Sequence, residues 1–341
     1  MLEKIIREML HSDRVLPTIT LEITSACNLK CVHCYLEDRK EPHTVNCLML
    51  SDIKSITKDL KELKVLSVML TGGEPMMHPE FYDIIKFLNE ENFIVNMMSN
   101  ITMININNIE IIEQYVNSIT TTLYGFSDDT YNAVTRSKDG YQRYCRAKDL
   151  LLSSSIKLTE RGILLKENKE DLMNYINCNM NTEMHISHTI NTNYAAQHRI
   201  DKKMSICYYC EWMKRNNANI DDSSEDAPIY VCNSCVDSLF IKANGDIYAC
   251  ANLDIGFGNI RSTSLKEIVF SGMLNKKREL FKYENFKKCY NCDHVKYNPV
   301  ICPGNNQEET GCMFTPSKYS CELCHSVYAA YNMFLSDKKN K

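Results

Sequence analysis

The sequence predicts an α/β protein in which a partial (β/α)6 barrel precedes a small cysteine-rich domain. Two observations carry this prediction. In the first two hundred residues, strand-like runs alternate with helix-like runs, which is the pattern of βαβ units around a parallel sheet. After residue 200 the long apolar runs become few, and eleven of the 17 cysteines occur there. A segment so poor in apolar residues is expected to depend on bound metal for its stability.

The first elements follow from local patterns. Apolar residues recur at helical spacing before Pro17, which predicts a short amphipathic helix over residues 1–16. Residues 18–24 alternate and are rich in β-branched side chains, as in a strand. Ser51 is expected to cap the next helix, and residues 65–70 form a buried strand that a Gly-Gly pair stops.

Further βα units repeat this pattern. Short β-rich runs predict the remaining strands at residues 94–98, 118–123, 157–165 and 184–190. Apolar residues at helical spacing predict helices that cover residues 81–88, 107–115, 140–152 and 171–177. Six such units can close partly into a barrel, and its ligand site is expected at the carboxyl ends of the strands.

The composition excludes several classes of protein. A hydrophobic fraction of 44% supports a folded core, and a net charge of −4 argues against a general nucleic-acid or membrane-surface binder. No apolar run reaches the ~18 residues of a membrane span, and the charged amino-terminus lacks a signal-peptide core. We therefore expect a cytoplasmic protein that binds neither nucleic acid nor membrane.

A cysteine motif directly follows the first expected strand. Cys27, Cys31 and Cys34 are spaced C-x3-C-x2-C. Three thiolates on one loop can hold three irons of a cubane and leave the fourth iron open to a substrate group. The alternative is a zinc site with His33 as fourth ligand, but a strand-end loop favours a catalytic site over a closed structural one.

This motif resembles the signature of the radical S-adenosylmethionine (radical SAM) enzymes, which carry C-x3-C-x2-C after the first strand of a partial, TIM-like (β/α)6 barrel. One unit later, Gly72, Gly73 and Glu74 resemble the family's GGE motif. In the family, the backbone and carboxylate of that motif hold the amino group of the methionine moiety. Glycines permit close backbone approach, and a carboxylate suits an ammonium group.

Weaker matches lie at other strand ends. The resemblance implies cofactor contacts for Tyr35 beside the cysteines, for Ser99 and Asn100 after the third strand, and for Thr122 in Thr-Leu-Tyr-Gly. Arg161, on the fifth strand, is expected to pair with the methionine carboxylate. The alternative for each is an ordinary polar residue at a strand end.

The carboxyl-terminal cysteines resemble a SPASM domain, the iron–sulfur-bound extension of radical SAM enzymes that modify peptides and proteins. The spacing from Cys235 to Gly245 and Cys250 is C-x9-G-x4-C, and residues 240–248 predict a hairpin with a two-residue Asn244-Gly245 turn. The next family element, C-x2-C-x5-C-x3-C, matches only at Cys289 and Cys292. Zinc remains a competitor in this half, because C-x2-C pairs suit both metals.

In the family, the ligands of two auxiliary clusters alternate along the sequence. The resemblance therefore implies two 4Fe–4S clusters in addition to the SAM-binding one. By this resemblance, the first auxiliary cluster is bound by Cys232, Cys235, Cys250 and Cys312. The second is bound by Cys289, Cys292, Cys302 and either Cys321 or Cys324. Cys207, Cys210 and one of Cys321 and Cys324 are then left over, as substitutes for a predicted ligand or as redox-active thiols.

The resemblance implies an enzyme that cleaves S-adenosylmethionine and uses the 5′-deoxyadenosyl radical to abstract hydrogen from a peptide or protein residue. A maturase of ribosomal peptides (RiPPs) that forms a thioether or other side-chain crosslink is the leading expectation. The alternatives are a sulfatase-type formylglycine maturase, whose Asp-Gly is Tyr124-Gly125 here, and a peptide epimerase. Non-enzyme alternatives are an iron–sulfur electron carrier and a zinc-binding module.

The expected domains are a radical SAM core over residues 17–200 and a SPASM-like domain over residues 201–341. Expected partners are the substrate and an electron donor such as flavodoxin or ferredoxin. Only 26 residues precede Cys27, so no leader-binding domain is expected there. A leader peptide would need a separate carrier or contact with the barrel itself.

Overall fold

The computed structural model describes most of the chain. The described residues are 16–36, 46–177, 185–187, 195–216, 229–232, 234, 238–297 and 301–339. The expected amino-terminal helix and Cys235 lie outside them. The domain boundary expected near residue 200 remains a prediction.

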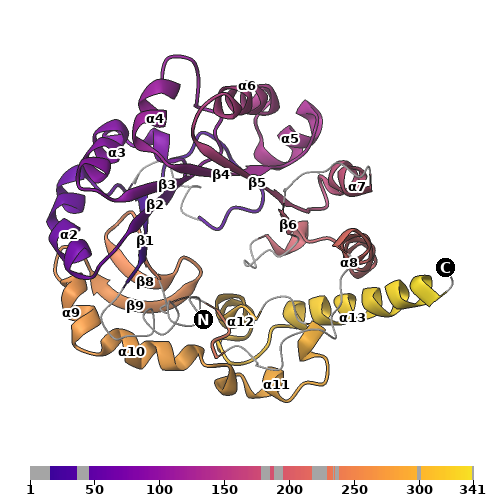
Figure 1. The fold of residues 1–341 in the computed structure, drawn as a ribbon. Coiled ribbons are helices and arrows are strands. Elements are labelled where there is room, and N and C mark those ends of the chain that lie inside the picture. Colours follow the sequence, from indigo (N-terminus) through magenta and orange to yellow (C-terminus); the bar gives the residue numbers. More distant parts are fainter. Residues whose placement is uncertain are drawn as a thin grey trace.

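One sheet organises the molecule. Within the described residues it contains nine strands in the order β6-β5-β4-β3-β2-β1-β7-β8-β9. Their bounds are β1 Thr18–Thr24, β2 Ser67–Gly72, β3 Ile94–Met98, β4 Ser118–Leu123, β5 Lys157–Ile163, β6 His185–Ser187, β7 Ser238–Ile241, β8 Asp246–Cys250 and β9 Leu253–Asn259. Strands β1 to β6 run parallel and curve as an open arc, which confirms the predicted partial barrel (Figure 1).

Helices of the first half cover the outer side of this arc (Figure 1). They are α2 Leu50–Glu62, α3 Phe81–Glu90, α4 Ile109–Tyr115, α5 Asp128–Thr135, α6 Gly140–Leu152 and α7 Lys169–Asn177. Ser51 is not the cap of α2, because the helix begins one residue earlier and the Asp52 carboxylate accepts the Met49 N–H at 3.0 Å. The short helix α5 was not predicted.

The two faces of the barrel strands differ in chemistry. Buried apolar side chains such as Ile19, Leu21, Val68 and Val95 alternate along the strands and belong to the main core. The intervening positions carry polar side chains and Met, and these form the concave face opposite the helices. Because successive strand residues point to opposite faces, this alternation leaves the inside of the arc available for ligands.

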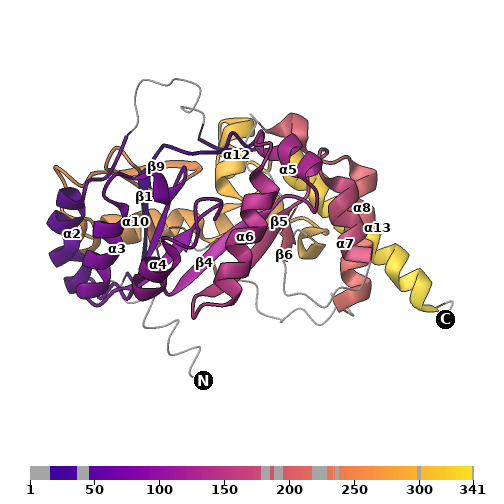
Figure 2. The ribbon, with the colours of Figure 1, turned by 90° about the horizontal axis from the view of Figure 1, so that it is seen from above.

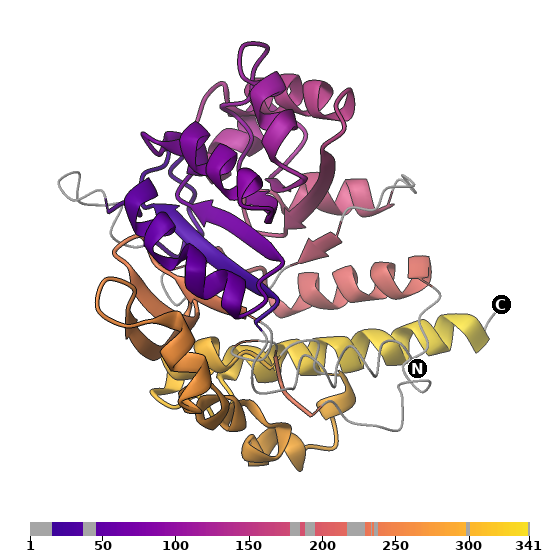
Figure 3. The same ribbon diagram turned by 60° about the vertical axis from the view of Figure 1, so that its left-hand side comes forward.

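The second half, in which the sequence shows few long apolar runs, is nevertheless largely helical. It contains α8 Lys202–Asn216, α9 Leu265–Phe270, α10 Met273–Arg278, α11 Lys287–Tyr290, α12 Pro303–Thr310 and α13 Lys318–Lys339. Short 3-10 turns are η2 Pro75–Met77, η3 Ala196–His198, η4 Glu279–Phe281, η5 Tyr283–Asn285 and η6 Val295–Tyr297. Helices α8 and α13 lie side by side around their own apolar cluster (Figure 3). With α7 they occupy the end of the molecule opposite α2 and α3 (Figure 2).

Among the described helices, none combines the length and the apolar character needed to cross a bilayer.

The second half is joined to the barrel by a hairpin. Strand β7 pairs in parallel with β1 and antiparallel with β8, so the hairpin extends the barrel sheet. Its turn is not the expected two-residue Asn244-Gly245 turn. The Gly245 N–H donates to the Lys242 carbonyl at 2.8 Å, so residues 242–245 form the turn, and Gly245 takes a φ of 90° that favours glycine.

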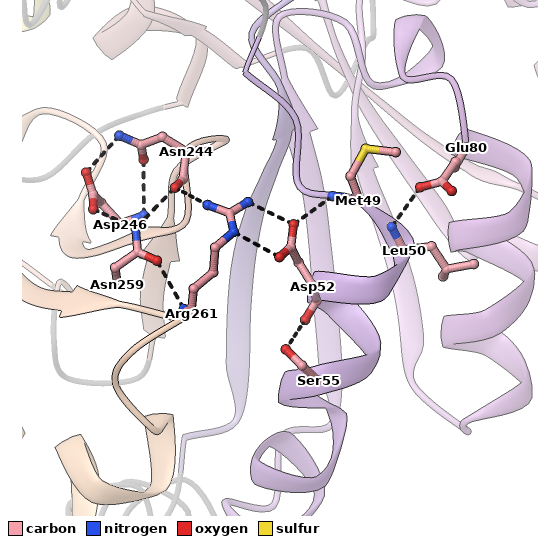
Figure 4. A network of polar contacts seen from close by, with 9 residues as sticks. All are labelled: Met49, Leu50, Asp52, Ser55, Glu80, Asn244, Asp246, Asn259 and Arg261. Carbon is pink, nitrogen blue, oxygen red and sulfur yellow. Dashed lines mark hydrogen bonds and ion pairs between the residues drawn. The ribbon is translucent and has the colours of Figure 1, made fainter.

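A polar network fastens the end of this hairpin to α2 (Figure 4). The Arg261 guanidinium donates to both carboxylate oxygens of Asp52, at 3.0 and 2.8 Å, and also to the Asn244 carbonyl. A bidentate pair fixes orientation as well as distance. The second half is therefore oriented against the barrel on its β1 side.

Candidate functional site

The cysteine loop follows β1 and is held at both ends of its central turn. The buried side chains of Leu29 and Val32 anchor it. The backbone N–H groups of Lys30 and Val32 donate to the carbonyls of Thr135 and Val134 at the end of α5, at 3.0 and 2.9 Å. The half-buried thiols that this loop presents are Cys27, Cys31 and Cys34.

The Gly-Gly-Glu loop packs against the backbone that precedes the cysteines. The Gly73 N–H donates to the Thr24 carbonyl and the Glu74 N–H to the Ala26 carbonyl, both at 2.8 Å. A Cβ on Gly73 would lie 1.9 Å from the Ala26 oxygen, and one on Gly72 would lie 2.4 Å from the Thr24 oxygen. Only glycine permits this approach, so the two motifs form one unit.

Glu74 is fully buried and connects a third strand end to this unit. One carboxylate oxygen accepts from the Met76 N–H at 3.2 Å and from the Ser99 hydroxyl at 2.9 Å. The other accepts from the Ser99 hydroxyl at 3.0 Å and from the Asn100 N–H at 2.9 Å. The carboxylate thus orders the ends of β2 and β3, and its role toward the cofactor's ammonium group remains a prediction.

Asn100 continues this connection to the cysteine loop. Its amide donates to the Asn28 side chain at 2.8 Å and approaches the Cys27 sulfur at 3.9 Å. The Asn28 amide in turn donates to the Thr102 hydroxyl at 2.8 Å. The structure therefore brings Ser99 and Asn100 beside both motifs, and it adds Asn28 and Thr102, which no sequence pattern had indicated.

Aromatic rings line the other side of the cysteine loop. Tyr124 is buried, and burial, followed by the nearby Cys31 thiolate, holds the pKa of Tyr124 well above its usual range. The centroid of the His33 ring lies 5.3 Å from that of Tyr124. The Tyr131 ring packs edge-on against Tyr124, with centroids 5.6 Å apart. His33 thus packs on this aromatic wall.

The strand register places four polar residues on the concave face. Glu22 and Thr71 are partners on β1 and β2, and Thr122 and Arg161 are partners on β4 and β5. The register through β3 keeps all four on the same face. The structure therefore brings Thr122 and Arg161 side by side, and Arg161 is exposed there. Their contacts with the cofactor remain predictions.

A cavity of about 680 Å³ lies between the cysteine loop and the hairpin. Tyr35 lines it from the loop, Glu22 from β1, Lys242 from the hairpin turn and Asp254 from β9. Glu22 is only 4% exposed, and its carboxylate accepts from the Ala243 N–H at 3.3 Å. Glu22 and Lys242 were not predicted as site residues, although a lone charged residue at an inward strand position was a usable signal.

Cys302 lies at the start of α12, close to the segment that follows strand β8. Gly304, at the start of α12, packs so closely on Asn252 that a Cβ would lie 2.4 Å from its carbonyl oxygen. Asn252 is two residues beyond Cys250. Burial, and then the charges of Cys250 and Cys232, raise the pKa of Cys302, although backbone hydrogen bonds oppose the shift. Cys302 therefore shares a neighbourhood with Cys232 and Cys250.

The resemblance instead grouped Cys302 with Cys289 and Cys292, and the grouping of the auxiliary ligands stays a prediction. Helix α12 carries Cys302 onto the turn between β8 and β9. Cys312, which was expected in its place, is exposed, and a hydrogen bond from the Phe314 backbone is the first cause that lowers the pKa of Cys312.

The remaining described cysteines of the second half lie on three helices or next to them. Cys289 is on α11 and Cys292 just after it, Cys321 and Cys324 are on α13, and Cys207 and Cys210 are on α8. Within the described ranges, no three Cys, His, Asp or Glu side chains converge as one bound metal ion requires. A cubane has no such requirement, because each thiolate binds a different iron.

Two family models match the sequence. The Radical SAM superfamily model matches residues 21–178, and the SPASM model, described as an iron-sulfur cluster-binding domain, matches residues 232–293. The chain belongs to the radical SAM superfamily and carries a SPASM domain. It is therefore an enzyme of S-adenosylmethionine radical chemistry, as the cysteine loop and the Gly-Gly-Glu loop predicted.

Individual relatives are distant from this radical SAM enzyme. It is 28% identical over 142 residues to the antilisterial bacteriocin subtilosin biosynthesis protein AlbA of Bacillus subtilis, a match that covers 40% of this chain and 31% of that protein. The chain thus spans less than a third of that relative. It is 22% identical over 359 residues to the AdoMet-dependent heme synthase of Oleidesulfovibrio alaskensis, with 88% of each covered.

Solved structures share the fold. The structure of anSMEcpe with bound AdoMet has a TM-score of 0.70 at 14% identity and covers 95% of this chain and 99% of that one. Streptococcus suis SuiB bound to its precursor peptide SuiA has a TM-score of 0.66 at 17% identity, with 90% and 76% covered. At these identities the likeness shows a common fold.

The residues present fit the cofactors of this family, a 4Fe–4S cluster with S-adenosylmethionine in the core and auxiliary clusters in the SPASM domain. None of the cysteines that the structure describes is in a disulfide. The cysteine loop that carries the three thiols also carries Tyr35, which lines the cavity. Such a donor set leaves one iron of a cubane open, as S-adenosylmethionine binding requires.

Replacement of Glu74 by glutamine tests the role of this carboxylate. The change keeps the shape but removes the charge and turns one acceptor into a donor that faces Ser99 or Asn100. A hydrogen bond to a charged group contributes roughly 1.5–3 kcal/mol, so we expect the affinity for S-adenosylmethionine to fall about ten- to a hundredfold. Titration with S-adenosylmethionine measures it, and iron content should stay unchanged.

Ser99→Ala is the matched control, because it removes one donor to Glu74 but keeps the negative charge. We expect a smaller loss of affinity than for Glu74→Gln. Equal affinity in the wild type and in Glu74→Gln would contradict a role for this charge in cofactor binding.

Proposed function

We propose that this radical SAM enzyme abstracts hydrogen from a residue of a peptide or protein substrate and forms a thioether or another side-chain crosslink. The observation that carries the proposal is the cavity between the cysteine loop and the SPASM hairpin. It lies on the concave side of the barrel, next to the loop whose three thiols fit the cofactor cluster.

The lining of this cavity suits a peptide. Its volume of about 680 Å³ is within the ~300–1,000 Å³ of ordinary ligand sites. Lys242 gives it one positive charge, and Glu22, Asp254 and Glu308 give it negative charges. The lining residues come from both domains and carry both signs of charge. Such a lining suits a peptide, whose backbone presents alternating donors and acceptors between its side chains.

The relatives add support of a coarser kind. AlbA is a biosynthesis protein of the bacteriocin subtilosin, and SuiB has been solved with a precursor peptide. The anSMEcpe structures include complexes with AdoMet and peptides. Peptides are thus ligands of proteins with this fold.

The chemistry must balance for a thioether. When bound, the cluster and S-adenosylmethionine supply a 5′-deoxyadenosyl radical, which takes one hydrogen atom from a substrate carbon. The thiol of the substrate loses a proton, a C–S bond forms, and one electron leaves through the SPASM domain to an external acceptor. Glu22 is the buried carboxylate of the cavity and is the candidate to receive the thiol proton, while the Ala243 N–H orients it.

Formylglycine formation is the second candidate. The observation that favours it is the match to anSMEcpe over 95% of this chain and 99% of that one. Against it, the position of the Asp-Gly typical of that branch is occupied by Tyr124-Gly125, and the Tyr124 side chain is buried against the cysteine loop rather than facing the cavity.

One assay separates these reactions. The anaerobically reconstituted protein is incubated with dithionite, S-adenosylmethionine and each short cysteine-containing peptide that a neighbouring open reading frame encodes. We expect the peptide to lose the mass of two hydrogen atoms and one thiol that can be alkylated. Replacement of the thiol group by an aldehyde oxygen would indicate formylglycine. Uptake of one deuterium from D2O, with no change of mass when the reaction is run in ordinary water, would indicate epimerisation. Either outcome, or an unchanged peptide, overturns the crosslinking proposal.

A further inference from the structure

One segment of the second half carries charge of the opposite sign to the rest of the chain. Between Lys276 and Lys296, seven residues are Lys or Arg and three are Asp or Glu, so this segment has a net charge of +4. The whole chain has a net charge of −4, which leaves −8 for all the other residues. Such an asymmetry gives one face of the molecule an electrostatic potential that attracts anionic partners.

Short helices hold this segment at an outer edge of the molecule. The segment runs through α10, η4, η5 and α11, and Figure 1 and Figure 3 both show this edge on the far side from α5 and α6. The buried Phe286 anchors the start of α11, and its ring packs edge-on against Phe314 with centroids 5.4 Å apart. The fold therefore fixes the position of α11 and of the side chains at its surface.

The cations of this segment fall into two groups. Lys277 donates to the Gly256 carbonyl, and Arg278 is buried. Lys282 pairs with Glu279 at 2.6 Å. Three further lysines are exposed and form no ion pair with the carboxylates that the structure describes, namely Lys276, Lys287 and Lys288. The charges of these three lysines are therefore available to a partner.

An exposed aromatic ring and an exposed thiol belong to the same segment. Tyr290 ends α11 and is 54% exposed, and its ring packs edge-on against Tyr283 with centroids 5.6 Å apart. Cys292, two residues further on, is also exposed and lies inside the SPASM match over residues 232–293. The basic patch, defined as Lys276, Lys287, Lys288 and Tyr290, thus adjoins a cysteine of the iron–sulfur domain at the surface.

The position of the basic patch indicates what kind of anion it serves. The SPASM domain binds iron–sulfur clusters, which exchange single electrons. A redox protein that docks beside Cys292 comes close to this domain, whereas a membrane or a nucleic acid gains nothing from that position. An acidic carrier is also repelled by the −8 of the remaining chain, so charge determines where it docks as well as how fast.

We propose that the basic patch is the docking surface for a small acidic one-electron carrier of the flavodoxin or ferredoxin type. In the docked complex, one electron passes from the SPASM domain to the oxidised carrier. The domain is oxidised and the carrier is reduced by one electron, and no bond forms or breaks. In turnover this is the electron that crosslinking releases, and to that extent the docking rests on the proposed function.

Electron transfer tests this docking without peptide or S-adenosylmethionine. The full-length enzyme is reconstituted anaerobically, reduced with dithionite, desalted and mixed in a stopped-flow instrument with purified oxidised flavodoxin, whose flavin absorbance is followed. We expect a rate that falls as the salt concentration rises. In the variant Lys276→Gln/Lys287→Gln/Lys288→Gln, the rate at low salt should fall about tenfold and lose most of its salt dependence.

The matched control removes three exposed lysines that lie elsewhere. Lys58→Gln/Lys64→Gln/Lys138→Gln changes the net charge by the same amount and should keep the wild-type rate to within about twofold. Wild-type rates in both triple variants, or equal losses in both, would overturn the proposal. A patch variant that transfers electrons normally but no longer binds phosphatidylserine vesicles would assign the surface to a membrane and would overturn it as well.

Two further measurements keep the result unambiguous. The iron content of both triple variants should equal that of the wild type. Since Lys288 precedes Cys289, the variant Lys276→Gln/Lys287→Gln, which leaves Lys288 in place, should show a smaller loss of rate with full iron content. A wild-type rate in this iron-replete variant would contradict the docking. Failure of the crosslinking proposal would leave all these rates as they are, because no peptide is present.

Discussion

Replacement of Cys27, Cys31 and Cys34 together by alanine should abolish the production of 5′-deoxyadenosine. These residues supply the thiols of the loop after β1, and without them no site-differentiated cluster can bind beside the Gly-Gly-Glu loop. The fold should survive, because Leu29, Val32 and the backbone bonds to α5 anchor the loop independently of the thiols. The nucleoside is measured after incubation with dithionite and S-adenosylmethionine in the absence of peptide.

The iron content distinguishes a local from a general defect. We expect a decrease from about twelve to about eight irons per chain, because the SPASM cysteines are untouched. Cys207→Ala should leave both the iron content and the cleavage unchanged, since Cys207 is an exposed thiol on α8. Continued cleavage by the triple variant would show that the cluster of the core lies elsewhere.

Gly73→Ala should cause a loss nearly as large through a single methyl group. The added Cβ would lie 1.9 Å from the Ala26 oxygen and 2.8 Å from the Ser25 oxygen. These are backbone atoms that cannot turn aside, so the segment directly before Cys27 must move. Overpacking of this kind costs about 1–3 kcal/mol of stability, and the shift also separates the two motifs that share these contacts. We expect deoxyadenosine production to fall by more than about tenfold.

The control for this variant is Gly256→Ala on β9. A Cβ there would meet its nearest neighbour, a carbon of the Tyr248 ring, at 3.6 Å, which is an ordinary contact. It should retain iron and cleavage. Thermal unfolding of both variants separates a global loss of stability from a local effect. Wild-type cleavage by Gly73→Ala would contradict the close packing of the two loops.

Local patterns were enough to predict much of the barrel. Strands β1, β3 and β4 have the bounds that alternation and β-rich composition predicted, because each is one contiguous segment in which at least every second side chain is buried. The cysteine loop and the Gly-Gly-Glu loop were also predictable, since each is one short segment at the end of a strand. The helix α5 was missed because its buried residues, Tyr131, Val134 and Thr135, are too few to establish a helical period.

The sequence by itself therefore determined the parallel barrel, the cysteine loop after β1 and the family to which the chain belongs. The tertiary structure decided which distant residues meet. It placed α5 against the cysteine loop, and it brought Glu22 and Lys242 into the lining of one cavity. It also placed the start of α12, which carries Cys302 and Gly304, against Asn252 just beyond Cys250. Spacing along the chain constrains only residues on one turn or strand. The contacts between distant residues depend on how α12 and the hairpin pack, and no local sequence pattern encodes that packing.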